Sequence, residues 1–135
     1  MGIPILVVDD DPVQQEILSL MLLRRLGYIS VPALNGRNAL STLQKNESIQ
    51  LVILDMGLPD IDGLELLSLI REHRPDLPVI MLTGQKDIGL AVKAMKAGAR
   101  DFLTKPPEKE RLEIAILNAL KASFLEKEVN RLIVQ

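Results

Sequence analysis

The stretch ILVVDDD, residues 5–11, joins a short β-branched apolar run to three consecutive aspartates. The same pattern recurs in LVILD, residues 51–55, and in VIMLT, residues 79–83, where an apolar run again ends at a polar residue. Short runs of this kind, separated by helical stretches, are typical of the buried strands of a parallel sheet. Because ligands bind beyond the carboxyl ends of such strands, the sequence predicts several carboxylates and a hydroxyl at one edge. A later run that ends at Lys105 adds a cation.

The composition indicates one ordinary globular domain and excludes several classes of function. Of 135 residues, 47% are hydrophobic and 25% are charged, and the net charge of −2 offers no basic surface for nucleic acid or anionic lipid. One tyrosine and two phenylalanines are too few for a base-stacking platform. No apolar stretch approaches the roughly 18 residues of a membrane span, and no signal peptide precedes the first strand, so a cytoplasmic protein is predicted. The lack of cysteine excludes disulfides and thiolate catalysis.

Five predicted strands alternate with helices along the chain. Pro12 in the first turn and Gly27 at the end suit the first helix. Asp62 and Asp87 are placed to cap the third and fourth helices, and Gly98 is placed to end the fourth. The predicted strands are residues 4–8, 29–33, 50–54, 78–82 and 100–104, and the predicted helices lie near 12–26, 36–46, 62–73 and 87–97.

The last predicted helix is unusually long. It starts after the two prolines at 106–107 and runs to about residue 133, which is roughly 39 Å at 1.5 Å per residue and longer than the sheet it covers. Leu125, Val129 and Leu132 continue the apolar pattern at coiled-coil spacing. This spacing favours a contact with a partner over a frayed tail.

The residues expected at the carboxyl edge indicate phosphoryl chemistry. Clustered carboxylates repel one another, so some would take up protons unless a cation lies among them. Oxygen ligands without a nearby histidine or cysteine favour a hard cation such as Mg²⁺. With Lys105 and the Thr83 hydroxyl, such a site can stabilise a phosphoryl group in transfer. Asp55, at the end of the middle run, is the natural covalent acceptor.

Four segments in order carry a resemblance to a known family: residues 5–11, 54–63 (LDMGLPDIDG), 81–84 (MLTG) and 102–106 (FLTKP). On these segments the chain resembles the receiver domain of bacterial two-component response regulators, from residue 3 to about residue 122. The resemblance implies an α/β fold, a doubly wound, flavodoxin-like (βα)5 domain with a parallel sheet in the strand order 2-1-3-4-5. It also implies a receiver domain at residues 1–122 and a helical extension or linker at residues 123–135.

The resemblance assigns roles to individual residues. Asp55 accepts a phosphoryl group from a phosphohistidine on a sensor histidine kinase. Asp10, Asp55 and the backbone carbonyl of Gly57 ligate Mg²⁺, and Asp9 assists through water. Lys105 pairs with the phosphoryl oxygens.

The resemblance also implies a switch. Thr83 swings toward the phosphoryl group and Phe102 follows into the space it leaves. The new charge then biases the fourth helix, the fifth strand and the last helix toward an active arrangement. A cis peptide is expected before Pro106. The product is a signal, so the domain is not expected to be an enzyme.

Several positions depart from the pattern of the family. Gly57 lacks the side chain that many receivers carry two residues after the acceptor, and Gln85 lies two residues beyond the switch threonine. Both positions influence dephosphorylation in the family, so the lifetime of the phosphoryl group is left open. Phe102 has no hydroxyl where tyrosine is common, and Pro107 replaces a larger apolar residue.

Two other classes of function were weighed. In a haloacid-dehalogenase-like phosphatase, Asp9 would be the nucleophile and Asp11 the acid/base, but this interpretation leaves Asp55 unexplained and no acidic pair follows Lys105. Asp11, just before the first helix, suits a helix cap equally well. A receiver-like module that only binds partners is disfavoured because the set of acceptor residues is complete. The single histidine, His73, supports neither a zinc site nor a phosphorelay role.

Residues 87–132 resemble receivers joined to AAA+ transcription activators. The resemblance implies a homodimer, either through the last helix or through the face formed by the fourth helix, the fifth strand and the last helix. An effector domain in control of transcription would lie outside this chain, since nothing in it reads nucleic acid and no part is expected to contact a membrane.

Overall fold

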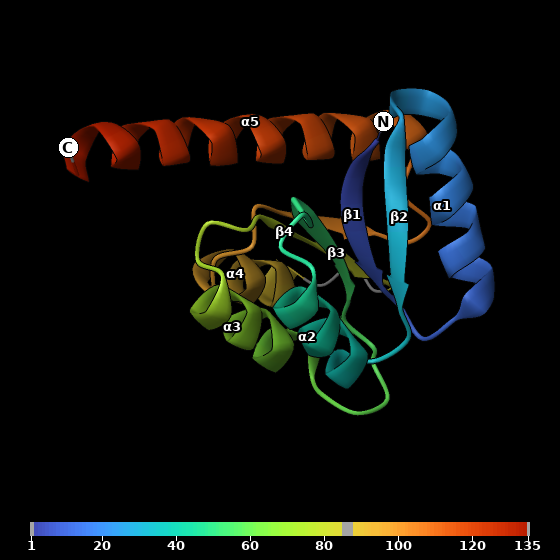
Figure 1. Ribbon diagram of the computed structural model, residues 1–135. Helices are drawn as coiled ribbons and strands as arrows, with labels where there is room; N and C mark the ends of the chain where they lie inside the picture. Colours follow the sequence, from blue (N-terminus) through green and yellow to red (C-terminus); the bar gives the residue numbers. More distant parts are fainter. Residues whose placement is uncertain (1, 85–87, 135) are drawn as a thin grey trace.

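The computed structural model describes residues 2–84 and 88–134, without the side chains of residues 24–26 and 134. Figure 1 shows a parallel sheet with helices packed on both of its faces. The elements in chain order are β1 (Ile3–Val8), α1 (Pro12–Leu26), β2 (Tyr28–Ala33), α2 (Gly36–Lys45), β3 (Leu51–Asp55), α3 (Gly63–His73), β4 (Val79–Thr83), α4 (Ile88–Lys96), β5 (Asp101–Thr104) and α5 (Lys109–Val134). The strand order β2-β1-β3-β4-β5, with every pair parallel, confirms the predicted doubly wound (βα)5 fold.

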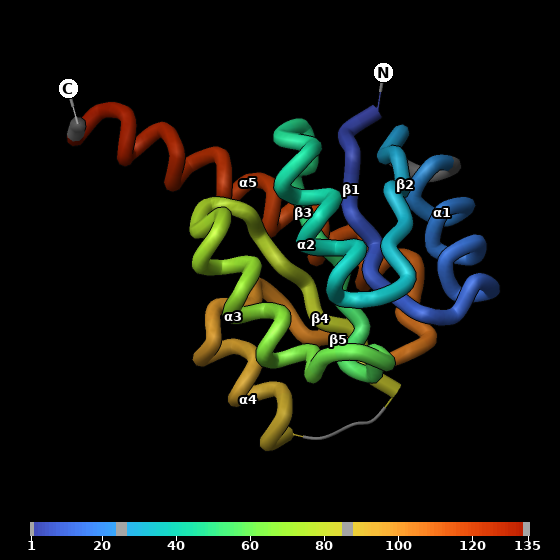
Figure 2. Tube along the Cα trace, turned by 60° about the horizontal axis from the view of Figure 1, so that its bottom comes forward, coloured from blue at the N-terminus to red at the C-terminus, as the bar shows by residue number. Residues whose placement is uncertain are grey.

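Alternate residues of the strands pack into two separate apolar cores, one on each face of the sheet. Leu6 and Val8 of β1 point into the core under α2, α3 and α4, whereas Ile5 and Val7 point into the core under α1 and α5. Figure 2 shows the same division, with α1 and α5 on one side of the sheet and the other helices opposite. Burial on both faces explains why the sequence of each central strand is continuously apolar and does not alternate.

The helix ends follow the capping rules used for their prediction. Asp11 is the N-cap of α1, with its side chain accepting from the Val13 amide, and Gly27 ends α1 in the left-handed region at φ 68°. Asp62 caps α3 by accepting from the Leu64 amide at 3.2 Å. Gly98, at φ 106°, follows α4. The cap predicted at Asp87 lies outside the described residues.

The central strands extend one residue further than predicted, and this difference matters for the edge. Asp55 and Thr83 were expected just beyond their strands, but each is the last residue of its strand, at 7% and 4% exposed. The ladder continues because the Met56 amide donates to the Leu82 carbonyl and the Lys105 amide donates to the Thr83 carbonyl. The two side chains are therefore held by regular backbone pairing and not by a loop.

Helix α5 is continuous over its predicted length and extends well past the sheet (Figure 1). Ser123 is buried, and its hydroxyl donates to the Asp76 carbonyl at 2.9 Å. Further along, Glu126 forms an ion pair with Arg100, which directly precedes β5. These contacts hold the helix to the base of the sheet, opposite the carboxyl edge. Among the described residues, no helix has both the length and the apolar character needed to cross a bilayer.

We predict that Leu66→Ala in the core under α3 lowers the free energy of unfolding by about 2–5 kcal/mol, because the fully buried side chain leaves a cavity. Urea unfolding followed by circular dichroism measures the loss. The matched control is Leu23→Ala on α1, where the side chain is 59% exposed and the expected loss is below about 1 kcal/mol. Equal losses in the two variants would contradict this assignment of the core.

Candidate functional site

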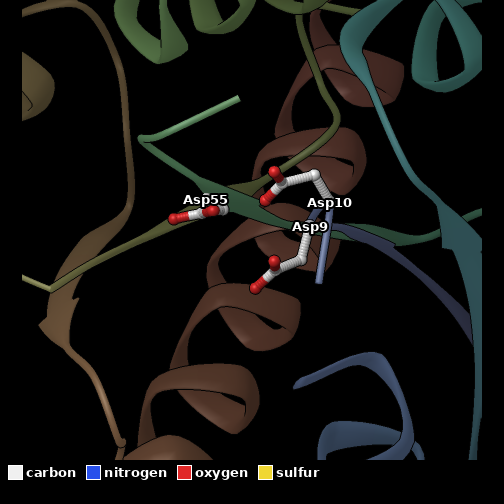
Figure 3. Close-up of side chains that lie close together, drawn as sticks. All are labelled: Asp9, Asp10 and Asp55. Atoms are coloured by element: carbon white, nitrogen blue, oxygen red, sulfur yellow. The ribbon is translucent and has the colours of Figure 1, made fainter. Parts of the chain in front are cut away.

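Three carboxylates meet at the carboxyl edge of the sheet. Asp9 and Asp10 directly follow β1, and Asp55 ends the neighbouring strand β3. One carboxylate oxygen from each residue lies within 4.8 Å of those of the other two. In Figure 3 the three side chains face a common space. The edge predicted from the sequence therefore exists as a compact acidic cluster.

Lys105 brings a positive charge into direct contact with this cluster. Its Nζ lies 2.9 Å from Asp55 Oδ1 and 3.0 Å from Asp9 Oδ2. Asp55 and Asp9 come from adjacent central strands, whereas Lys105 follows the edge strand β5. The Lys105–Pro106 peptide is cis, as the family resemblance implied. The Lys105 ammonium group thus contacts an acid that lies 96 positions earlier in the chain.

The acids determine the charge state of Lys105. Burial by itself would lower the pKa of the ammonium group, but the hydrogen bonds and charges of Asp55 and Asp9 outweigh that effect and raise it. Lys105 therefore stays protonated throughout the neutral range. Its charge offsets part of the repulsion among the three carboxylates.

Asp9 and Asp10 differ in how they are held. Asp9 is 1% exposed, and its Oδ1 accepts from the Asp11 amide at 2.9 Å while its Oδ2 faces Lys105. Asp10 is exposed and reaches the cluster from its rim. Asp11 caps α1 and is not part of the cluster. The phosphatase interpretation requires Asp11 as its acid/base, and this position does not suit that role.

The donor set fits a hard metal ion. Three carboxylates can share one ion when their oxygens lie within about twice a metal–oxygen distance, roughly 4–5 Å. One oxygen of each acid lies within 4.8 Å of those of the other two, which satisfies this condition. The group contains no histidine, a ligand that softer metals prefer. The cluster is thus able to hold a cation such as Mg²⁺.

The remaining predicted residues lie around the cluster. Thr83 ends β4, next to β3, and is buried. Phe102 of β5 is half-buried, pairs with Met81 and packs against the core under α4. Gly57 is exposed in the loop after β3, where an added Cβ would meet no atom within 4 Å, so the backbone does not require glycine there. Gln85 lies outside the described residues.

The structure adds two polar residues that the sequence analysis did not single out. Asp60, in the loop after Asp55, accepts from the amides of Gly36 and Arg37 at 2.9 and 3.0 Å and so ties that loop to the start of α2. These backbone hydrogen bonds lower the pKa of Asp60. Gln15 of α1 is buried and contacts the backbone of Asp9. Neither contact leaves a signal in the spacing of residues along the chain.

The geometry agrees with comparisons to known proteins. The model of the response regulator receiver domain family matches residues 5–117. Regulatory protein LuxO of Vibrio cholerae is 41% identical over 96 residues, which are 70% of this chain and 21% of that protein. The C4-dicarboxylate transport transcriptional regulatory protein DctD of Pseudomonas aeruginosa is 39% identical over 121 residues, which are 90% of this chain and 26% of that protein.

A solved structure shows the same likeness in three dimensions. NtrX from Brucella abortus, in complex with ADP, superposes with a TM-score of 0.90 and 36% identity, covering 98% of this chain and 30% of that one. The chain spans about a fifth to a quarter of the length of the curated relatives named above. Because the family model matches residues 5–117, most of its length, the chain belongs to the response regulator receiver domain family.

Proposed function

We propose that this domain accepts a phosphoryl group on Asp55 from a sensor histidine kinase and converts the added charge into a change of its surface. The observation that carries this proposal is the position of the Asp55 carboxylate, which contacts Lys105 and lies within 4.8 Å of Asp9 and Asp10. A nucleophile, a fixed cation and two further acids at one edge suit phosphoryl transfer, where positioning and electrostatics do most of the work.

In the transfer, an Asp55 oxygen forms a bond to phosphorus while the bond between phosphorus and the donor histidine nitrogen breaks. Lys105, already 2.9 Å from Asp55 Oδ1, pairs with the phosphoryl oxygens. Mg²⁺, when bound, would supply positive charge to the phosphoryl oxygens and the acids. Asp10, Asp55 and the carbonyl of Gly57 would hold it, with Asp9 acting through water. The commitment of both Asp9 oxygens to the Asp11 amide and Lys105 supports that indirect role.

The switch follows from the charge added at Asp55. A phosphoryl group brings extra negative charge and strong acceptor oxygens, so the Thr83 hydroxyl turns toward it and Phe102 moves into the space released. The burial of Thr83 and the half-buried position of Phe102 on the adjacent strand support this movement. Because β5 lies between α4 and α5 in the chain, the surface formed by these three elements changes with it.

The output of the switch is proposed to be control of transcription by a domain outside this chain. DctD is named a transcriptional regulatory protein, and the chain matches only about a quarter of its length. We propose an AAA+ type effector and a homodimer. Leu125, Val129 and Leu132, exposed on α5 beyond the sheet, support pairing through that helix.

One prediction of this proposal concerns the acceptor. Incubation with acetyl phosphate and Mg²⁺ adds one phosphoryl group to the wild type and none to Asp55→Asn, because the amide cannot act as the nucleophile; intact-mass analysis reads out the difference. The matched control, Asp11→Asn, makes the same chemical change at an acid that caps α1 and lies outside the cluster, so this variant stays phosphorylatable. A phosphoryl group on Asp55→Asn would revive the phosphatase interpretation with Asp9 as nucleophile.

A second prediction distinguishes the effect of Lys105 on Mg²⁺ binding from its effect on phosphoryl transfer. Lys105→Met removes the cation from between Asp9 and Asp55, so the acids bind Mg²⁺ more tightly. The same change slows phosphorylation by about 10²-fold or more, since a preorganised charge is lost. Calorimetry measures the first effect and single-turnover phosphorylation measures the second. Lys127→Met, a lysine of α5 that faces Asp76, is the control and alters neither. Loss of both properties together would argue against this division of roles.

A third prediction tests the dimer. Sedimentation over a concentration series, with and without beryllofluoride as a phosphate mimic, shows self-association of the wild type. Val129→Asp and Leu132→Asp together abolish it, because charges replace the apolar positions of α5. Glu128→Gln, a change of a half-buried polar residue on the same turn, leaves it intact. A wild type that stays monomeric under every condition contradicts the proposed dimer.

A further inference from the structure

Gln15 joins helix α1 to the backbone at the carboxyl edge. Its side chain is 8% exposed, and its Nε2 donates to the carbonyls of Val7, Asp9 and Ala33 at 2.8, 3.0 and 3.1 Å. Val7 and Asp9 lie at the end of β1, and Ala33 ends β2. One amide group therefore donates to three carbonyls near the carboxyl ends of two neighbouring strands.

Only the Nε2 group of the Gln15 amide forms hydrogen bonds in this contact. An amide nitrogen has two hydrogens, so three carbonyls must share them. The Gln15 Oε1 atom is buried and has no hydrogen-bond partner among the described residues. An unpaired buried acceptor is unfavourable, so the benefit of glutamine at this position comes from its donor side.

The acidic cluster explains why a donor is needed there. Figure 3 shows the Asp9 and Asp10 side chains leaving the backbone in opposite directions, while one oxygen of each lies within 4.8 Å of an Asp55 oxygen. Strand β1 ends at Val8, and the chain then passes into the loop before α1. Buried carbonyls at such a strand end need partners from outside the ladder.

Gln15 fixes the peptide between the two acids. The Asp9 amide donates to the Ala33 carbonyl at 3.0 Å, and the Asp9 carbonyl accepts from Gln15. The Ala33 carbonyl in turn accepts from Gln15, so one small network holds both main-chain groups of Asp9. The Asp9–Asp10 peptide cannot rotate without breaking it, and that peptide sets the directions in which both side chains leave the backbone.

We propose that Gln15 is a positioning residue for the metal site: its amide locks the Asp9–Asp10 peptide so that both carboxylates face Asp55. This inference rests on the proposed function, in which these acids bind Mg²⁺. Hydrogen-bond partners behind the ligands of a metal typically change its affinity by about 10–100-fold. Gln15 acts through the backbone of Asp9 and touches neither ion nor phosphoryl group.

The test uses Gln15→Met, which keeps the length of the side chain and removes its donors. Mg²⁺ affinity is measured by isothermal titration calorimetry, and stability by urea unfolding in the absence of metal. The proposal predicts a Kd for Mg²⁺ about 10-fold higher than in the wild type. The Mg²⁺ concentration for half-maximal phosphorylation by acetyl phosphate rises in parallel, while the rate at saturating Mg²⁺ changes less than about 3-fold, because Asp55 and Lys105 are untouched.

Two controls separate positioning from general loosening of the fold. Leu18→Ala opens a cavity one turn along α1, where the side chain is 1% exposed, and lowers stability without touching the carbonyls. It should leave the affinity for Mg²⁺ unchanged. Gln14→Met makes the same chemical change at a half-buried neighbour and should alter neither property. If Gln15→Met fails to fold, Gln15→Asn, whose amide is too short to reach all three carbonyls, takes its place.

The outcomes are distinct. Normal Mg²⁺ affinity in a destabilised Gln15→Met protein overturns the inference and reduces Gln15 to a structural residue. An equal loss of affinity in Leu18→Ala also overturns it, because loosening alone would then be the cause. A wild type that binds no Mg²⁺ overturns the proposed metal site itself, and this result is distinguishable because it does not depend on any substitution.

Discussion

Electrostatic repulsion among Asp9, Asp10 and Asp55 is the constraint around which this domain is arranged. Parallel strands bring their carboxyl ends to one edge, so acids that follow β1 and β3 are placed side by side. Because Asp9 and Asp55 are buried, a cation nearby is needed to offset the repulsion between their charges. Lys105 supplies one, and because it follows β5 it reaches the cluster only when β1, β3, β4 and β5 are paired. The negative charge that Lys105 does not offset favours the binding of a metal ion, and the added positive charge then favours a phosphoryl group.

The sequence was most informative where a physical pattern repeats along the chain. Buried parallel strands have continuous apolar runs, and helix starts and ends have their own residues, so the fold, the strand order implied by the family and the caps at Asp62 and Gly98 were predictable. The acidic edge was predictable because strand ends meet there. Asp55 and Thr83 were placed one residue outside their strands, since the reading of apolar runs assigns a polar residue to the loop.

Contacts between side chains and backbone carbonyls were beyond the reach of that reasoning. Gln15 lies on α1 in a helical pattern that gives it no special status, and its importance depends on which carbonyls at the ends of β1 and β2 lie within reach of its amide. Asp60 is one of two acids in its loop, and it joins that loop to the start of α2 through two amides. Such pairings arise from the packing of elements in space, which local spacing does not encode.

Strand β5 is short, and it has a charged side chain at each end. Lys105 at one end holds the acids of the edge, whereas Arg100 at the other end holds Glu126 of α5. A shift of this strand along its own axis would therefore displace two ion pairs, one at the carboxyl edge of the sheet and one at the opposite edge. The eight residues of α5 beyond Glu126 form an arm of roughly 12 Å, so each 5° of tilt at that ion pair moves the free end of the helix by about 1 Å. The domain thus has the mechanics of a lever whose pivot lies where β5 meets the long helix.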